Sequence, residues 1–168
     1  MHHNTEKNLL AAFAGESQAN RKYLAFAKKA EEEGLEGVAK LFKAAAAAET
    51  VHAHNHLGVV GGVKSTLENL KAAFDGEHHE FTSMYPEFIA TAKEEKQNEA
   101  FKSFHWANEV EKVHGGLYRA AIEAVEAGAG LPAKDYFVCD KCGMTVADAA
   151  PDKCPVCSAA KEAFFKVD

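Results

Sequence analysis

Two pairs of residues in this sequence have the spacing of metal chelates. A glutamate is followed three residues later by a histidine at Glu49-x-x-His52 and again at Glu111-x-x-His114. On a helix this step keeps both side chains on one face, about one turn apart, so a carboxylate and an imidazole can bind the same ion. One such pair alone is usually solvated surface. Two pairs in one chain favour a metal site.

Three further glutamates, Glu16, Glu77 and Glu80, interrupt stripes of apolar residues with helical periodicity. Ionised carboxylates inside a bundle need a compensating positive charge, and no lysine or arginine shares these stripes. Two divalent metal ions would supply that charge, and oxygen ligands with two imidazoles suit iron or manganese better than zinc. We therefore predict a dinuclear carboxylate site. Its candidate ligands are Glu16, Glu49, His52, Glu77, Glu80, Glu111 and His114.

Two tyrosines have positions that could support these ligands. Tyr23 follows Glu16 by two helical turns, and Tyr85 lies a little more than two turns after Glu77. Either hydroxyl could donate a hydrogen bond to a ligand carboxylate. Ordinary amphipathic packing explains both tyrosines equally well.

Four cysteines near the end of the sequence form a second metal signal. They occur as two Cys-x-x-Cys pairs, Cys139 with Cys142 and Cys154 with Cys157. Four thiolates with this spacing can enclose one tetrahedral ion, whereas disulfides are disfavoured in a reducing compartment. The segment is also too short for a sufficient apolar core, so a metal should help it fold. Spacing alone leaves both iron and a zinc ribbon open.

Helical periodicity indicates the elements that position these residues. The helical segments run from about residue 5 to Gly34, from Leu35 to about Gly61, from about Glu77, and from about Asn98. Between Gly61 and Gly76 we expect a long connection containing one short capped turn, and Pro86 should bend the third helix. Four helices with one long crossover predict an all-α, ferritin-like four-helix bundle. Glycines and a proline in residues 127–132 predict a boundary between the bundle, 1–133, and a cysteine domain, 134–168.

The composition excludes several classes of protein. The 168 residues are 47% hydrophobic and carry 25 acidic against 19 basic side chains, a net charge of -6. This balance provides no basic surface for nucleic acid or an anionic membrane, and no apolar run is long enough to span a bilayer. The polar start of the sequence has no apolar signal core. We expect a soluble, cytoplasmic protein.

Together these motifs resemble those of the rubrerythrin family over nearly the whole sequence. The matching segments occur in the family's order: Ala14-Gly15-Glu16-Ser17, Glu49-x-x-His52, Gly76-Glu77-x-x-Glu80, Met84-Tyr85-Pro86, Glu111-Lys112-x-His114 and the two cysteine pairs. The resemblance implies a ferritin-like di-iron domain followed by a rubredoxin-like domain. It also implies two irons in the bundle and one iron held by the four cysteines.

The resemblance further implies a role for each site. The bundle glutamates and His114 would be di-iron ligands, His52 would alternate with Glu80 as one iron changes oxidation state, and Tyr23 and Tyr85 would support the ligands. The implied activity is reduction of hydrogen peroxide to water in defence against oxidative stress. Electrons would come through the rubredoxin-like iron from an NAD(P)H-linked reductase or a rubredoxin. The family also implies a head-to-tail homodimer.

Two features depart from the expected pattern, and two other functions stay open. Ser158 follows the second cysteine pair where glycine is usual, and a left-handed backbone there would cost about 1 kcal/mol. Gly115-Gly116 is unusual within a helix and indicates close packing beside the metals. A ferroxidase that detoxifies iron could use the same bundle, and a non-enzymatic zinc-ribbon module on a metal-stabilised bundle could use the same cysteines.

Overall fold

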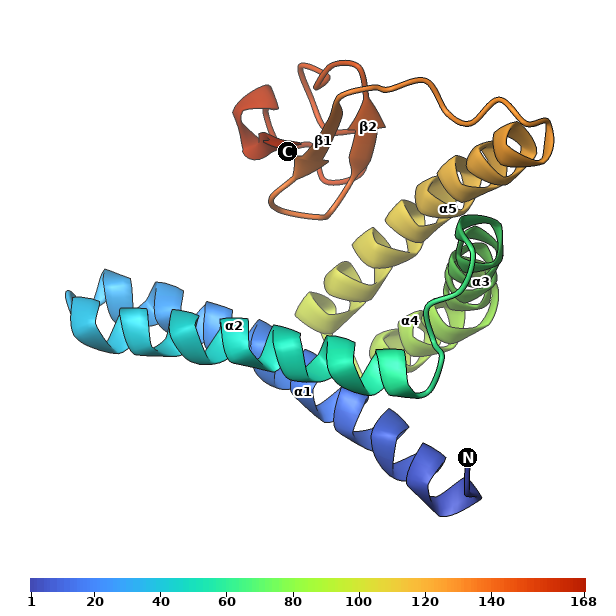
Figure 1. Cartoon of the computed structure of the whole chain (residues 1–168). Coiled ribbons are helices and arrows are strands. Elements are labelled where there is room, and N and C mark those ends of the chain that lie inside the picture. The colour runs from blue at the N-terminus through green and yellow to red at the C-terminus, as the bar shows by residue number, and fades with distance from the viewer. The chain divides into compact units, whose positions relative to one another are not determined.

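The computed structural model describes residues 1–168 and consists of two compact units, Met1–Lys64 and Ser65–Asp168. The first unit has two long helices, α1 (His3–Glu32) and α2 (Glu36–Val59), and the second has three helices and a small sheet (Figure 1). The elements of the second unit are α3 (Thr66–His79), η1 (Glu80–Met84), α4 (Tyr85–Glu94), α5 (Asn98–Glu126), β1 (Tyr136–Cys139), β2 (Thr145–Ala147), η2 (Lys161–Ala163) and β3 (Phe164–Val167).

The first unit is an antiparallel helix pair joined by a tight turn (Figure 1). Gly34 adopts a left-handed backbone, φ 75°, and ends α1 where the sequence predicted. The buried side chains of the pair are alanines: Ala27, Ala30, Ala39, Ala46 and Ala53. Small side chains let the two helix backbones approach closely, which holds the facing residues of α1 and α2 at short range.

The third helix begins earlier than predicted. Ser65 and Glu68 form the capping box that the sequence indicated, since the Glu68 side chain accepts from the Ser65 amide and the Ser65 hydroxyl accepts from the Glu68 amide. This box opens a helix of 14 residues instead of one turn, so the expected long connection up to Gly76 was wrong. Gly76 lies within α3, where its cost of about 1 kcal/mol is outweighed by packing against α5. Arg119 of α5 covers the ring of Phe74 at 5.2 Å.

The helix changes its winding before Pro86. Residues Glu80–Met84 form a π-helical turn between α3 and α4, and the Tyr85 amide donates to the Glu80 carbonyl, five residues back. Pro86 then lies in the first turn of α4, where a missing N–H is tolerated. π-Helical turns are rare and frequently occur at functional sites.

Only one of the two adjacent glycines of α5 is required by packing. A Cβ placed on Gly115 would lie 3.1 Å from Cε1 of Phe81, whereas one on Gly116 would have no neighbour within 4 Å. Gly115 thus permits the close approach of η1 to α5 that the sequence indicated. α5 ends at Glu126, and Gly128 and Gly130 follow with left-handed backbones.

The cysteine domain is built on a three-stranded antiparallel sheet in the order β2-β1-β3. Phe137 pairs with Val146 on one side of β1, and Val138 pairs with Phe165 on the other. Long α-helices followed by a small domain with four clustered cysteines confirm the predicted fold class, an all-α helical bundle with a C-terminal cysteine domain. No helix is both long and apolar enough to cross a membrane.

Candidate metal centres

Three predicted ligands come together on the first helix pair. One ligand atom each from Glu16 on α1 and from Glu49 and His52 on α2 lie within 4.8 Å of one another. His52 Nδ1 is 3.0 Å from Glu49 Oε2. A hydrogen bond between the two carboxyl groups raises the pKa of Glu16 and lowers that of Glu49. A cation placed among these groups would favour the ionised form of both carboxyls.

The helix pair holds this cluster with side-chain hydrogen bonds and small neighbours. The Asn20 amide, one turn after Glu16, donates to the Ala46 carbonyl at 2.7 Å and to the Thr50 hydroxyl at 2.8 Å. These bonds fasten α1 to α2 beside Glu49. Fixed neighbours of this kind orient metal ligands and limit the entropy lost when an ion binds.

Three more predicted ligands come together on the second unit. Ligand atoms of Glu77 on α3 and of Glu111 and His114 on α5 lie within 4.8 Å of one another. His114 Nδ1 is 2.7 Å from Glu111 Oε2 and 3.8 Å from Glu77 Oε1. Burial, with the charge of Glu111, raises the pKa of Glu77 to about 7, and the hydrogen bond to Glu111 raises the pKa of His114. A proton or a metal ion at this position would compensate the charge of these half-buried carboxylates.

Glu80 and Tyr85 lie next to the second cluster rather than within it. Glu80 is outside the compact group of three. Burial and the negative charge of Glu111 raise the pKa of Glu80. Burial, followed by the charges of Glu80, Glu111 and Glu77, raises the pKa of Tyr85, so its hydroxyl lies near the carboxylates. Tyr23 instead belongs to an aromatic group, with its ring centroid 6.3 Å from Phe26.

The four cysteines form a third centre within the small domain. All four Sγ atoms lie within 4.8 Å of one another, with Cys139 and Cys157 at 3.6 Å and Cys142 and Cys154 at 3.5 Å. Thiolates bound at ~2.3 Å to one tetrahedral ion would lie about 3.8 Å apart. The observed spacing therefore fits one metal ion.

The two cysteine pairs have the same backbone turn. The Gly143 amide donates to the Cys139 carbonyl at 2.9 Å, and the Ser158 amide donates to the Cys154 carbonyl at 3.0 Å. Both turns need a left-handed residue, with φ 83° at Gly143 and 65° at Ser158. Ser158 thus adopts the strained backbone that the sequence indicated, without displacing a cysteine.

The thiols differ in acidity because their surroundings differ. Burial alone would raise the pKa of Cys154, but hydrogen bonds from the backbone amides of Cys157 and Val156 lower it to about 7. Burial raises the pKa of Cys142 well above its ordinary value. A bound cation would hold all four groups as thiolates and remove this difference.

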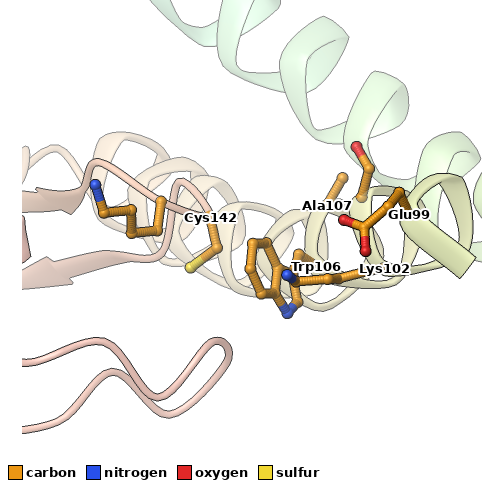
Figure 2. Close-up of a pocket in the computed structure, with 7 residues that line it drawn as sticks. Glu99, Lys102, Trp106, Ala107 and Cys142 are labelled. Atoms are coloured by element: carbon orange, nitrogen blue, oxygen red, sulfur yellow. The ribbon is translucent and has the colours of Figure 1, made fainter.

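One edge of the cysteine centre borders a pocket. Figure 2 shows Cys142 and Trp106 of α5 on its wall, and the pocket has a volume of about 310 Å³. Lys102 and Lys141 also line it, with Glu99 as the one acidic residue, and Lys102 Nζ lies 4.7 Å from the centroid of the Trp106 ring. A molecule docked here would meet positive charge next to a cysteine ligand.

One residue beside these centres was not indicated by the sequence. Thr145 Oγ1 lies 2.9 Å from His114 Nε2 and joins the cysteine domain to a predicted ligand on α5. A threonine in a short strand carries no motif, and its place beside His114 depends on how the domain packs on α5.

Comparisons with known proteins agree with both parts of the chain. A family model described as Rubrerythrin matches residues 7–122, and one described as Rubrerythrin, rubredoxin-like domain matches residues 137–165. The chain is 37% identical to a rubrerythrin of Porphyromonas gingivalis over 96% of this chain and 88% of that protein. It is also 37% identical to nigerythrin of Nitratidesulfovibrio vulgaris, over 95% of this chain and 85% of that protein.

Solved structures give the same result. The fully reduced, all-ferrous state of nigerythrin is 35% identical, covers 97% of this chain and 86% of its own, and has a TM-score of 0.58. The likeness extends over the helices and the cysteine domain together.

Proposed function

Because this chain belongs to the rubrerythrin family, we propose that it is a non-haem di-iron peroxidase that reduces hydrogen peroxide to water. The observation that carries this proposal is the occurrence, in one chain, of two Glu/Glu/His clusters and a four-thiol centre. The first two suit a pair of redox-active metals, and the third suits a one-electron carrier.

We propose that the bundle, residues 1–133, holds two irons and that residues 134–168 hold one. The bundle ligands would be Glu16, Glu49, Glu77, Glu80, Glu111 and His114, with His52 in exchange with Glu80. The four cysteines would hold the third iron. Carboxylates with two imidazoles fit iron better than zinc, and the protons now shared among the acids leave when a cation binds.

Bound iron would supply the two electrons and the Lewis acid that O–O cleavage requires. The reaction takes up two electrons and two protons per hydrogen peroxide and releases two waters. Tyr85 keeps its proton at neutral pH because burial and three carboxylates raise its pKa. Its hydroxyl would therefore be available to donate a hydrogen bond to a carboxylate of this cluster.

Electrons would enter at the cysteine domain. Cys142 lies at the edge of a pocket that also contains Lys102 and Lys141. These lysines favour an acidic surface on the donor, since complementary charge speeds encounter. A suitable donor is an NAD(P)H-linked reductase or a rubredoxin.

We further propose that the chain works as a head-to-tail homodimer in the cytoplasm. Leu41 and Val51 of α2 are 68% and 57% exposed in a unit whose buried side chains are alanines, so an apolar partner surface would stabilise it. The four free thiols suit a reducing compartment.

An anaerobic titration of the reduced protein with hydrogen peroxide tests the main proposal. We expect about three irons per chain and oxidation of the bundle irons by one peroxide per pair. Stopped-flow mixing with peroxide and, separately, with oxygen would compare the two oxidants. Rapid oxidation by oxygen with no reaction toward peroxide would indicate the ferroxidase instead. Zinc in the cysteine centre of native protein would exclude the electron path.

A further inference from the structure

Thr145 makes two hydrogen bonds whose directions can be assigned. Its hydroxyl lies 3.1 Å from the Gly143 carbonyl oxygen, which can only accept, so Thr145 donates its one proton there. Its oxygen also lies 2.9 Å from Nε2 of His114. When the hydroxyl proton is used in this way, the oxygen accepts from Nε2–H. The bonds therefore run from His114 to Thr145 to Gly143.

This direction determines which nitrogen of His114 is available to a metal. When a cation replaces the proton between Nδ1 and Glu111 Oε2, a proton that stays on Nε2 leaves the lone pair of Nδ1 to the metal. Nδ1 is the nitrogen that faces the carboxylates, 2.7 Å from Glu111 Oε2 and 3.8 Å from Glu77 Oε1. Thr145 thus acts on the ligand cluster through the far side of the ring, as an orienting partner of a metal-binding histidine does.

The same bonds lead into the cysteine centre. Gly143 follows Cys142 directly, and its amide donates to the Cys139 carbonyl at 2.9 Å. A Cβ on Gly143 would lie 3.8 Å from Val110 Cγ1, so the first cysteine turn packs directly on α5. Two hydrogen bonds and a short length of backbone therefore connect the Cys142 thiol with the His114 imidazole.

We propose that Thr145 positions His114 for metal binding and carries electronic coupling from the four-cysteine centre to the bundle site of the same chain. This inference rests on the proposed function, because it requires iron at both centres. Each transfer oxidises the cysteine-bound iron from ferrous to ferric and reduces one bundle iron from ferric to ferrous. Two transfers, replenished by the external donor, supply the two electrons that one hydrogen peroxide consumes with two protons.

The test compares Thr145→Val with Thr145→Ser in the full-length, iron-loaded protein. Valine keeps the shape of the side chain but cannot accept from Nε2–H or donate to Gly143, whereas serine keeps the hydroxyl. Thr91→Val is the matched control, because the Thr91 hydroxyl bonds only to its own helix, at the Glu87 carbonyl. Unchanged visible absorbance of the cysteine-bound iron would show that each variant retains the small domain.

The measurement needs no peroxide. Fully ferric protein is mixed anaerobically with a limiting one-electron donor, and absorbance follows the cysteine-bound iron as it is reduced and then reoxidised by the bundle. We expect Thr145→Val to slow reoxidation at least fivefold and to shift the midpoint potential of the bundle irons. Thr145→Ser should restore both, and Thr91→Val should change neither. A Thr145→Val protein with wild-type reoxidation and an unchanged potential would overturn the proposal.

Failure of this inference can be told apart from failure of the proposed function. Thr145-dependent transfer in a protein whose reduced bundle does not react with peroxide would uphold the electron path and refute the peroxidase. Peroxide reduction together with electron transfer that does not depend on Thr145 would uphold the peroxidase and refute the role of Thr145. A bundle that binds no iron in the native protein would refute both.

Discussion

Glu77 Oε1 on α3 lies 3.8 Å from His114 Nδ1 on α5, and both groups bind protons more tightly than usual. Burial is the main cause at Glu77, followed by the charge of Glu111, whereas the hydrogen bond to Glu111 is the main cause at His114. Protons therefore stabilise the metal-free cluster, and a cation would compete with them for the same oxygen and nitrogen atoms.

Stability of the metal-free protein should fall as the pH rises from about 5 to about 7. The pKa of Glu77 is raised from 4.5 to about 7, so in this range the folded chain keeps a proton that the unfolded chain has released. The raised pKa of His114 acts in the same direction. Urea unfolding of chelated and iron-loaded protein at both pH values would show a loss only in the chelated sample. Greater stability of the chelated protein at pH 7 would contradict the prediction, and Glu77→Gln should weaken the dependence.

Glu49→Ala should remove the bundle metals. Its carboxylate lies between Glu16 and His52, so its loss leaves the first cluster with two ligands instead of three. Metal analysis after gel filtration should show about one iron per chain, held by the cysteines. Glu36→Ala is the control on the same helix, since Glu36 is exposed in the first turn of α2. Full iron content in Glu49→Ala would rule out the proposed ligand set.

Cys142→Ser should separate electron delivery from peroxide chemistry. The serine variant lacks one thiolate of the cysteine centre, so turnover coupled to a reductase should fall to the background rate. A bundle reduced chemically beforehand should still react with peroxide at close to the wild-type rate. Stopped-flow absorbance and steady-state NAD(P)H consumption measure the two properties. If both are lost, the two centres do not divide the work in this way.

The two adjacent glycines of α5 should respond differently to alanine. Gly116→Ala adds a methyl group with no neighbour within 4 Å and should raise the free energy of unfolding by about 0.5–1 kcal/mol. Gly115→Ala meets the Phe81 ring and should lower it by about 1–3 kcal/mol. Urea unfolding of the iron-loaded proteins checks both values. Equal effects of the two substitutions would show that the Phe81 ring does not restrict the size of the side chain at position 115.

Ser158→Gly should stabilise the cysteine domain. Ser158 has φ 65°, a conformation that costs a residue with a Cβ about 1 kcal/mol or more. Glycine loses part of that gain through its more flexible unfolded state, so we expect about 0.5–1 kcal/mol. The gain in stability should be measurable as a slower loss of iron from the cysteines to a chelator. A faster loss would show that the serine contributes a contact that outweighs its backbone cost.

The proximity of Glu49 to His52 and of Glu111 to His114 was predictable, because helical spacing alone brings each pair together. The cysteine centre was predictable for the same reason, since two short turns determine its geometry. The start of α3 was not, because Gly76 suggested a break and the packing of Phe74 under Arg119 is invisible in the sequence. Thr145 could not be found at all, because its partner lies 31 residues away along the chain.

The π-helical turn at Glu80–Met84 also determines where Tyr85 points. In an uninterrupted α-helix, eight residues advance the side-chain direction by about 80° beyond two full rotations, which would turn Tyr85 away from Glu77. The one additional residue in the wider turn subtracts about 100°, leaving the two side chains within about 20° of each other. A regular α-helix over the same eight residues would therefore keep every ligand and the tyrosine itself, yet turn the phenol about 80° away from Glu77. The one-residue widening of the turn, rather than the chemical identity of the two side chains, aligns the pair.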